Sequence, residues 1–305
     1  MAVVRPFKGI RPKTDLVEKV ASLPYDVMNR EEAKEMAKGN ENSFLHVVRA
    51  EIDVDDSVSQ YDESVYKTAR KNLDQMIEDG ILDQDGTPKF YIYRQIMDGR
   101  VQTGIVGCTS IDDYMNDIIK KHEFTRPEKE VDRINNFDHC DANTAPIFLT
   151  YRKNDIINKL VNDWIKFHKP VYNFTSDDDI THIAWVIDDE AINSQIGEIF
   201  SGIDYLYIAD GHHRSASSVK VGLKRRETYP DYTGEEEFNY FLSVIFPDED
   251  LFIMDYNRVI KDLNGNSEEE FMTKVKEKFE VEEYTGEGQY KPLEKHTFGM
   301  YLDSK

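Results

Sequence analysis

A short apolar run that leads directly into a glycine constrains the fold of this chain more than any other feature. Residues 205–209 read Tyr-Leu-Tyr-Ile-Ala, and they are followed by Asp210, Gly211, His212, His213 and Arg214. An uninterrupted apolar run of this length is typical of a strand buried on both faces, and the small residues after Arg214 favour a helix. The sequence therefore predicts a buried strand, a tight glycine turn and a helix at this point.

Two patterns alternate along the rest of the chain. Apolar residues at helical spacing predict helices after Asn29 and over residues 62–80, 156–165, 190–200 and 268–279. Runs of β-branched and aromatic residues predict strands over residues 90–95, 101–109, 181–187, 240–246, 252–260 and 297–302. Asp98-Gly99, between the first two of these strands, is a strong hairpin signal. Together these elements predict an α+β fold with mixed sheets and flanking helices.

The length of 305 residues is enough for one elaborate domain or for two domains. We expect an N-terminal α+β part over residues 1–115 and a phosphate-binding part over residues 116–305, with one interlocked domain as the alternative. The last predicted strand runs almost to Lys305, so we expect the chain to be truncated at its C-terminal side.

Composition excludes several classes of function. The formal net charge is -21 and the sequence pI is about 4.8, so the surface as a whole repels nucleic acids and anionic membrane surfaces. The two cysteines, Cys108 and Cys140, have no CxxC or metal-ligand spacing, which favours a reducing compartment. The chain starts without a signal-peptide pattern, so we expect a cytoplasmic protein with no membrane and no nucleic-acid partner.

The glycine turn has the chemistry of a phosphate site. A helix that begins after Gly211 exposes backbone N–H groups at the positive end of its dipole, where an anion can bind. Arg214 adds a planar fork for two phosphate oxygens, and His212 and His213 add imidazole donors. Asp210 can hold Mg²⁺. The structural alternative is that Asp210 only caps the helix and that one histidine satisfies a backbone carbonyl.

A second polar segment can supply a proton acceptor, which a hydroxyl nucleophile needs. Glu123 is our candidate for this base, within a stretch dense in lysine and arginine. His122, Thr125 and Arg126 surround it in the sequence and are our candidates for contacts to the substrate. The alternative is a solvated helix face with ordinary ion pairs.

Several motifs resemble a known family. They lie at residues 6–12 (Pro-Phe-Lys-Gly-Ile-Arg-Pro), 24–27 (Pro-Tyr-Asp-Val), 122–125 (His-Glu-Phe-Thr), 208–214 (Ile-Ala-Asp-Gly-His-His-Arg) and 256–259 (Tyr-Asn-Arg-Val). The chain resembles the domain of unknown function 1015 family, which is grouped with free serine kinases in the ParB/sulfiredoxin superfamily. The resemblance spans essentially the whole chain, and it implies a ParB/sulfiredoxin-like core with its phosphate site at the Gly-His-His-Arg turn.

The resemblance also implies an activity. Free serine kinases transfer a phosphoryl group to the hydroxyl of L-serine and form O-phosphoserine. Carried over, Gly211, His212, His213 and Arg214 bind the phosphates of the donor, Asp210 holds the metal, and Glu123, Asp210 and His213 are the catalytic groups. The implied donor is ATP, ADP or pyrophosphate with Mg²⁺. Sulfiredoxins carry a cysteine where this chain has His212, which argues against cysteine-sulfinate repair.

Two other functions remain open. A metal-dependent phosphohydrolase would use His122, Glu123, Asp210 and His213 around a divalent cation that activates water. A nucleotide-sensing regulator would bind a phosphate ligand at the same turn without turnover. The sequence leaves the phosphoryl donor, the acceptor and the oligomeric state undetermined.

Overall fold

The structure is a computed structural model that describes residues 1–302. The chain divides into two compact units, Met1–Phe252 and Ile253–Lys305. Both segments from which we predicted the functional site lie in the first unit, so its sheet and helices determine where those side chains point.

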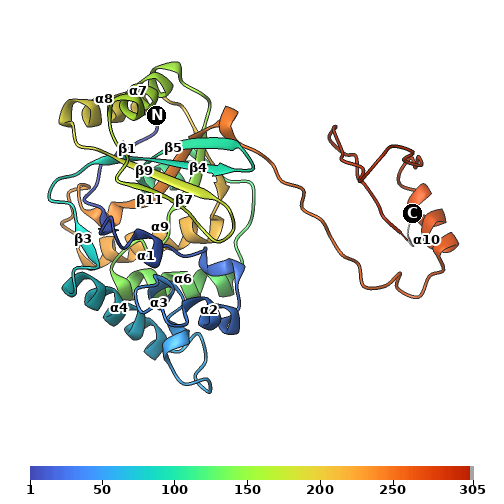
Figure 1. Cartoon of the computed structure of the whole chain (residues 1–305), viewed down its shortest axis with the longest axis horizontal. Helices are drawn as coiled ribbons and strands as arrows, with labels where there is room; N and C mark the ends of the chain where they lie inside the picture. Colours follow the sequence, from blue (N-terminus) through green and yellow to red (C-terminus); the bar gives the residue numbers. More distant parts are fainter. Residues whose placement is uncertain (303–305) are drawn as a thin grey trace. The chain divides into compact units, whose positions relative to one another are not determined.

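Nine strands of the first unit form one mixed sheet in the order β6-β10-β7-β11-β5-β4-β9-β8, with β1 paired to β5 (Figure 1). In chain order these strands are β1 (Val4–Arg5), β4 (Phe90–Met97), β5 (Arg100–Ser110), β6 (Ile119–Lys120), β7 (Ile147–Tyr151), β8 (Tyr172–Thr175), β9 (Thr181–Ile187), β10 (Leu206–Asp210) and β11 (Tyr240–Pro247). The pairs β6–β10 and β7–β11 are parallel and the other pairs are antiparallel. A separate antiparallel pair joins β2 (Ile10–Pro12) to β3 (Leu82–Gln84).

Helices cover both faces of this sheet. The first unit contains α1 (Val17–Val20), α2 (Arg30–Ala37), α3 (Leu45–Val48), α4 (Glu63–Glu78), α5 (Ile111–Met115), α6 (Pro127–Cys140), α7 (Asp155–Phe167), α8 (Glu190–Ser201) and α9 (His212–Thr228), with short 3-10 turns η1 (Tyr25–Val27), η2 (Ala50–Asp53), η3 (Glu237–Asn239) and η4 (Asp248–Asp250). Helices α7 and α8 lie on one side of the sheet, and α9, α6 and α4 lie on the other (Figure 1). The α+β class with a mixed sheet and flanking helices is thus confirmed.

The hairpin predicted at Asp98-Gly99 is confirmed, and both residues have positive φ, 52° and 77°. This backbone twist matches the twist of the two strands that it joins. The interior of the sheet packs Phe90, Ile92 and Ile245 against helices on both sides, and all three are fully buried. Burial on both faces explains why the central strands read as nearly continuous apolar runs.

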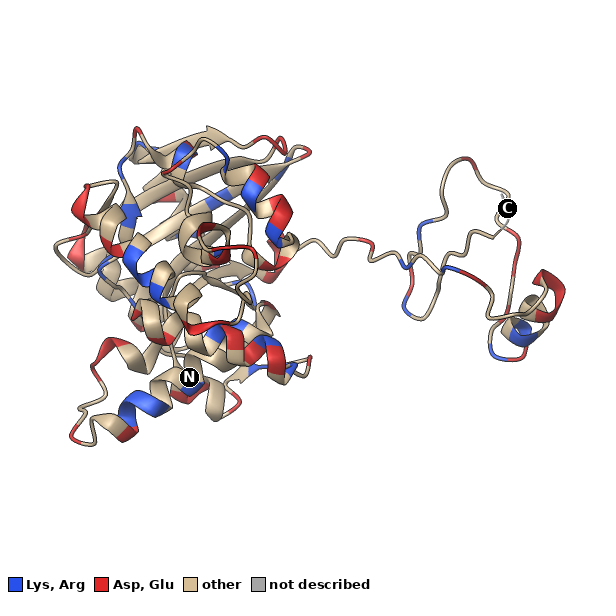
Figure 2. Cartoon of the chain, turned by 90° about the horizontal axis from the view of Figure 1, so that it is seen from below, with Lys and Arg blue, Asp and Glu red and all other residues tan. Residues whose placement is uncertain are grey.

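Charged side chains of both signs are interspersed along the helices (Figure 2). Many of them form short-range ion pairs on one helix, such as Lys67 with Glu63 and Lys159 with Asp163. Exposed pairs of this kind contribute little to stability, at most about 0.5 kcal/mol each. The stability of the fold therefore does not depend on these surface ion pairs.

Two predicted strands are wrong. Residues 252–260 and 297–302 have no regular secondary structure in the described part of the chain. Ile253 and Val259 are 91% and 99% exposed, and no strand within residues 1–302 pairs with residues 253–260. A β-branched and aromatic composition favours a strand only where a neighbour takes up its backbone N–H and C=O groups. The helix predicted between them is confirmed as α10 (Glu268–Lys276), which begins with a capping box between Ser267 and Glu270.

The expected division near residue 115 falls inside the sheet. Strand β5, which ends at Ser110, pairs along six residues with β11, which begins at Tyr240. Strands from residues 1–115 and from residues 116–305 therefore share one set of backbone hydrogen bonds. Among residues 1–302, no helix is both long enough and apolar enough to cross a lipid bilayer.

Two helix glycines provide a test of the packing. A Cβ atom at Gly222 of α9 would lie 2.4 Å from the carbonyl oxygen of Phe238, whereas a Cβ at Gly197 of α8 would meet the nearest backbone atom at 3.6 Å. We expect Gly222→Ala to destabilise the fold by about 1–3 kcal/mol, because a backbone carbonyl cannot move aside. The matched change Gly197→Ala should leave stability unchanged or raise it by up to about 1 kcal/mol through helix propensity. Urea unfolding of both variants measures this difference, and equal effects would contradict the packing described for α9.

Candidate functional site

The strand, turn and helix predicted around Gly211 are present. Strand β10 ends at Asp210, Gly211 has a φ of 95°, and α9 begins at His212. A Cβ at Gly211 would lie 3.2 Å from Nε of Arg214. The positive φ and this close approach both require glycine at the turn.

The first turn of α9 has free backbone donors. Its first backbone hydrogen bond runs from Ser215 N–H to Gly211 O, at 2.9 Å. The N–H groups of residues 212–214 precede that bond, and no side chain of the described residues caps this end of the helix. Unpaired N–H groups at the positive end of a 17-residue helix attract an anion. This part of the predicted phosphate site is thus geometrically available.

The second polar segment lies against this turn. The backbone N–H of His122 donates to Nε2 of His212 at 3.4 Å, and that of Arg126 donates to Nε2 of His213 at 2.9 Å. The rings of His122 and His212 meet edge to face, with centroids 4.4 Å apart. The two adjacent histidines of α9 therefore tether the loop that carries Glu123, although 90 residues separate the segments.

The ring of His212 also lies beside Glu123. Because Nε2 of His212 accepts a backbone N–H, a neutral ring carries its proton on Nδ1, which lies 3.7 Å from a carboxylate oxygen of Glu123. Burial of the ring, reinforced by the neighbouring His122, lowers the pKa of His212, and this outweighs the opposing effect of Glu123 and Asp210. The neutral form therefore dominates at pH 7.

Glu130 of α6 was missed by the sequence analysis as a site residue. Its side chain is buried. It accepts a hydrogen bond from Thr125 Oγ1 at 2.8 Å and forms an ion pair with Lys220. Burial alone would raise the pKa of Glu130, but the bonds from Lys220 and Thr125 lower it. Its backbone oxygen also accepts the Ser217 hydroxyl at 3.0 Å. In sequence Glu130 is one carboxylate among several in a charged run, and only tertiary contacts distinguish it.

Arg214 does not stand free as a phosphate clamp. Its side chain is buried, and its Nη1 donates to the carbonyl oxygen of Pro146 while Nη2 donates to Oδ2 of Asp210, both at 2.5 Å. The guanidinium thus fixes the end of β10 against the segment before β7. The side chain of Asp210 remains 68% exposed, and among the described residues no hydrogen bond reaches its other oxygen, Oδ1.

The predicted site residues fall into two groups, one around the two histidines of α9 and the other formed by Asp210 and Arg214. The structure brings His122, Glu123, Thr125 and Arg126 into one cluster with His212 and His213. Within residues 1–302, no three histidine, cysteine, aspartate or glutamate side chains are arranged to hold a metal ion.

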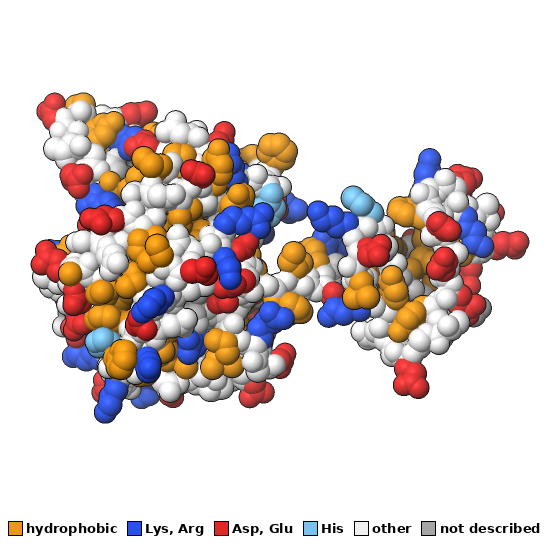
Figure 3. Space-filling model, turned by 90° about the horizontal axis from the view of Figure 1, so that it is seen from above, with side chains coloured by type: hydrophobic (Ala, Val, Ile, Leu, Met, Phe, Trp, Pro, Cys, Tyr) orange, Lys and Arg blue, Asp and Glu red, His pale blue; other side chains and the backbone are white. Residues whose placement is uncertain are grey.

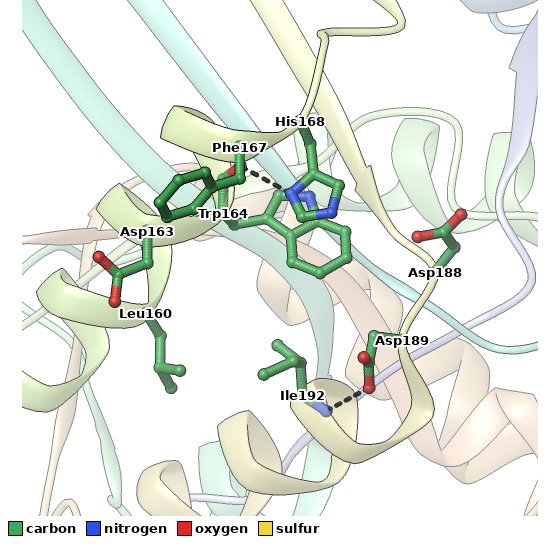
Figure 4. A pocket seen from close by; sticks show the side chains of 8 residues that line it. All are labelled: Leu160, Asp163, Trp164, Phe167, His168, Asp188, Asp189 and Ile192. Atoms are coloured by element: carbon green, nitrogen blue, oxygen red, sulfur yellow. Dashed lines mark hydrogen bonds between the residues drawn. The ribbon is translucent and has the colours of Figure 1, made fainter.

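Two hollows lie elsewhere on the first unit. One of about 500 Å³ lies between α7 and α8, where the rings of Trp164 and His168 stack with centroids 3.7 Å apart (Figure 4). Figure 3 shows the face that carries these helices, with hydrophobic side chains between charged ones. The other, of about 670 Å³, is lined mainly by residues 2–6, residues 87–89 and α8. Neither is lined by a predicted site residue.

The pH dependence of folding tests the state of His212. A histidine whose pKa is lower in the folded protein than the unfolded value of about 6.5 is stabilising above that pH, and this contribution is lost as the pH falls below it. We expect the free energy of unfolding to drop on going from about pH 7.5 to about pH 5.5, and to drop less in His212→Gln, which keeps an acceptor but does not titrate. Chemical denaturation at both pH values measures this, and identical slopes for the two proteins would show that His212 is not held neutral.

Comparison with known proteins gives one match. A family model described as "Protein of unknown function (DUF1015)" matches residues 4–305 of the chain. No curated protein and no solved structure matches it.

Proposed function

The chain belongs to the DUF1015 family, and we propose that it is a small-molecule kinase that transfers a phosphoryl group to the hydroxyl of free L-serine. The observation that supports this proposal best is the contact between the two segments. The carboxylate of Glu123 lies 3.7 Å from His212, the first residue of α9, so a proton acceptor stands beside a helix N-terminus with free N–H groups. Acceptor activation and phosphate binding thus occupy neighbouring positions.

In this proposal the donor binds at the start of α9. The N–H groups of residues 212–214 hydrogen-bond its phosphate oxygens, and Gly211 lets the backbone approach closely. Arg214 acts as a positioning residue, because its guanidinium is already bound to Pro146 and Asp210. The donor is ATP, ADP or pyrophosphate, all of which present the same phosphate chemistry to this turn.

The metal in the proposal is Mg²⁺ at Asp210. Mg²⁺ is commonly held by one or two carboxylates, with water and substrate phosphates as its other ligands. A single exposed Asp210 oxygen fits that pattern and does not require a cage of protein ligands. When bound, the ion would neutralise charge on the phosphates.

Glu123 is the proposed general base. It removes the proton from the serine hydroxyl as the serine oxygen forms a bond to the transferred phosphorus, and the bridging P–O bond of the donor breaks with its electrons leaving on the donor product. Nδ1 of His212, 3.7 Å from the carboxylate, would lie beside the base. His213 is tied to the Arg126 N–H, so it holds the loop that carries the base.

We further propose a ParB/sulfiredoxin-like core and a cytoplasmic location. The first rests on the resemblance of the 208–214 motif to that superfamily. The second is supported by the two cysteines, which are both unpaired and buried.

Substitution of the base tests the kinase proposal. With serine, Mg²⁺ and each of ATP, ADP and pyrophosphate, we expect O-phosphoserine from the wild type. We expect about a hundred- to ten-thousandfold lower turnover from Glu123→Gln, with donor binding retained. Glu128→Gln is the matched control, since Glu128 is an exposed carboxylate on the first turn of α6. Mass spectrometry of the products measures the transfer.

Three results would contradict the proposal in different ways. Phosphate released from the donor without O-phosphoserine would favour the phosphohydrolase. Tight binding of a nucleotide without any product would favour the regulator. Equal turnover by the wild type and Glu123→Gln would remove Glu123 from the reaction.

A further inference from the structure

The Pro-Tyr-Asp-Val motif at residues 24–27 has no role in the function proposed so far. Its Tyr25 belongs to η1, is buried, and lies under the guanidinium of Arg133 on α6, with the guanidinium carbon 3.8 Å from the ring centroid. Arg133 is itself buried, and its Nε and Nη2 both donate to Oδ2 of Asp132, at 2.9 and 2.6 Å. The motif thus packs on a buried, partly paired cation.

One polar atom of each of these two side chains is left without a protein partner. Among residues 1–302, no hydrogen bond reaches the hydroxyl of Tyr25 or Nη1 of Arg133. Within these residues, the only side-chain polar atoms that are both fully buried and without a hydrogen-bond partner are Nε of Arg30 and Nε of Arg49. The Tyr25 hydroxyl and Arg133 Nη1 are not among these atoms, so each of them keeps some exposure to solvent although most of its side chain is buried. Two such donors close together can bind an anion.

Arg133 lies on the helix that pairs with α9, the helix that carries the phosphate turn. Helices α6 and α9 run in the same direction, because Arg126 bonds His213 near their starts and Asp138 bonds Arg225 near their ends. Arg133 thus lies along the same helix pair as the phosphate turn. Burial raises the pKa of Tyr25, and the charges of Arg133 and Arg214 oppose that rise.

We infer that Tyr25 and Arg133 bind the carboxylate of the phosphoryl acceptor. This inference rests on the proposed function and specifies its substrate as a hydroxyl compound that carries a carboxylate. Arg133 is already paired with Asp132 at 2.6 Å, so it suits a ligand with a single negative charge better than a phosphate dianion. The phenol and the free guanidinium N–H would each donate to one carboxylate oxygen. The donor phosphates remain at the start of α9.

The experiment compares L-serine with L-serinamide, which keeps the hydroxyl and the amine but lacks the carboxylate. Calorimetric titration measures the binding of each compound, and steady-state kinetics measures the KM for serine and for the donor. Tyr25→Phe keeps the ring under Arg133 and removes only the hydroxyl, and Arg133→Lys keeps the charge beside Asp132. Tyr61→Phe, at an exposed tyrosine, is the matched control.

We expect the wild type to bind serine at least about tenfold more tightly than serinamide, since hydrogen bonds to a charged group are worth about 1.5–3 kcal/mol. Tyr25→Phe and Arg133→Lys should weaken serine binding about tenfold, leave serinamide binding and the KM of the donor unchanged, and so reduce the discrimination. Tyr61→Phe should behave as the wild type.

The outcomes separate the two proposals. Formation of O-phosphoserine with equal use of serine and serinamide would overturn the carboxylate subsite and leave the kinase standing. Binding of serine that depends on Tyr25 without any phosphoryl transfer would support the subsite and overturn the kinase. If neither compound binds and nothing is phosphorylated, both proposals are wrong.

Discussion

The buried carboxylate of Glu130 holds together the segments on which the candidate site depends. It joins the loop at Thr125, its own helix α6 and helix α9 at Lys220, and its backbone receives Ser217. A buried charge is tolerated only when it is paired and hydrogen-bonded. The loop that carries Glu123 is therefore held against α9 through Thr125 and Glu130 as well as through the two histidines.

The acidic surface and the proposed anionic ligand are compatible because the attraction is local. A net charge of -21 disfavours long-range approach of a phosphate, but the unpaired N–H groups of α9 act within the first turn of the helix. Salt limits the reach of the surface charges to about 8–10 Å. Neutral His212 adds no repulsion toward Mg²⁺ at Asp210. The strongly acidic surface is thus compatible with the phosphate and the Mg²⁺ that we propose at this turn.

The buried arginines of this region are each held in place by a carboxylate. The guanidinium of Arg214 is fixed by Asp210, four residues earlier in the chain. The guanidinium of Arg133 is fixed by the adjacent Asp132. A fixed guanidinium loses little entropy when it meets a ligand, but it offers fewer free donors than an exposed one. This is why the free backbone N–H groups, rather than Arg214, are the stronger candidates for contacts to the donor.

The sequence by itself determined the local elements, and the tertiary structure decided which of them meet. Periodicity predicted α4, α7, α8 and β9 nearly to the residue, because a buried stripe or a buried face leaves a regular apolar pattern. The turn at Gly211 was also predictable from local sequence, because its backbone has a positive φ that favours glycine. The run at residues 252–260 failed because a strand also needs a partner, which composition does not reveal. The roles of Glu130, Arg214 and Tyr25 each depend on a contact with a residue at least 68 positions away in the chain. No local sequence pattern encodes such a contact.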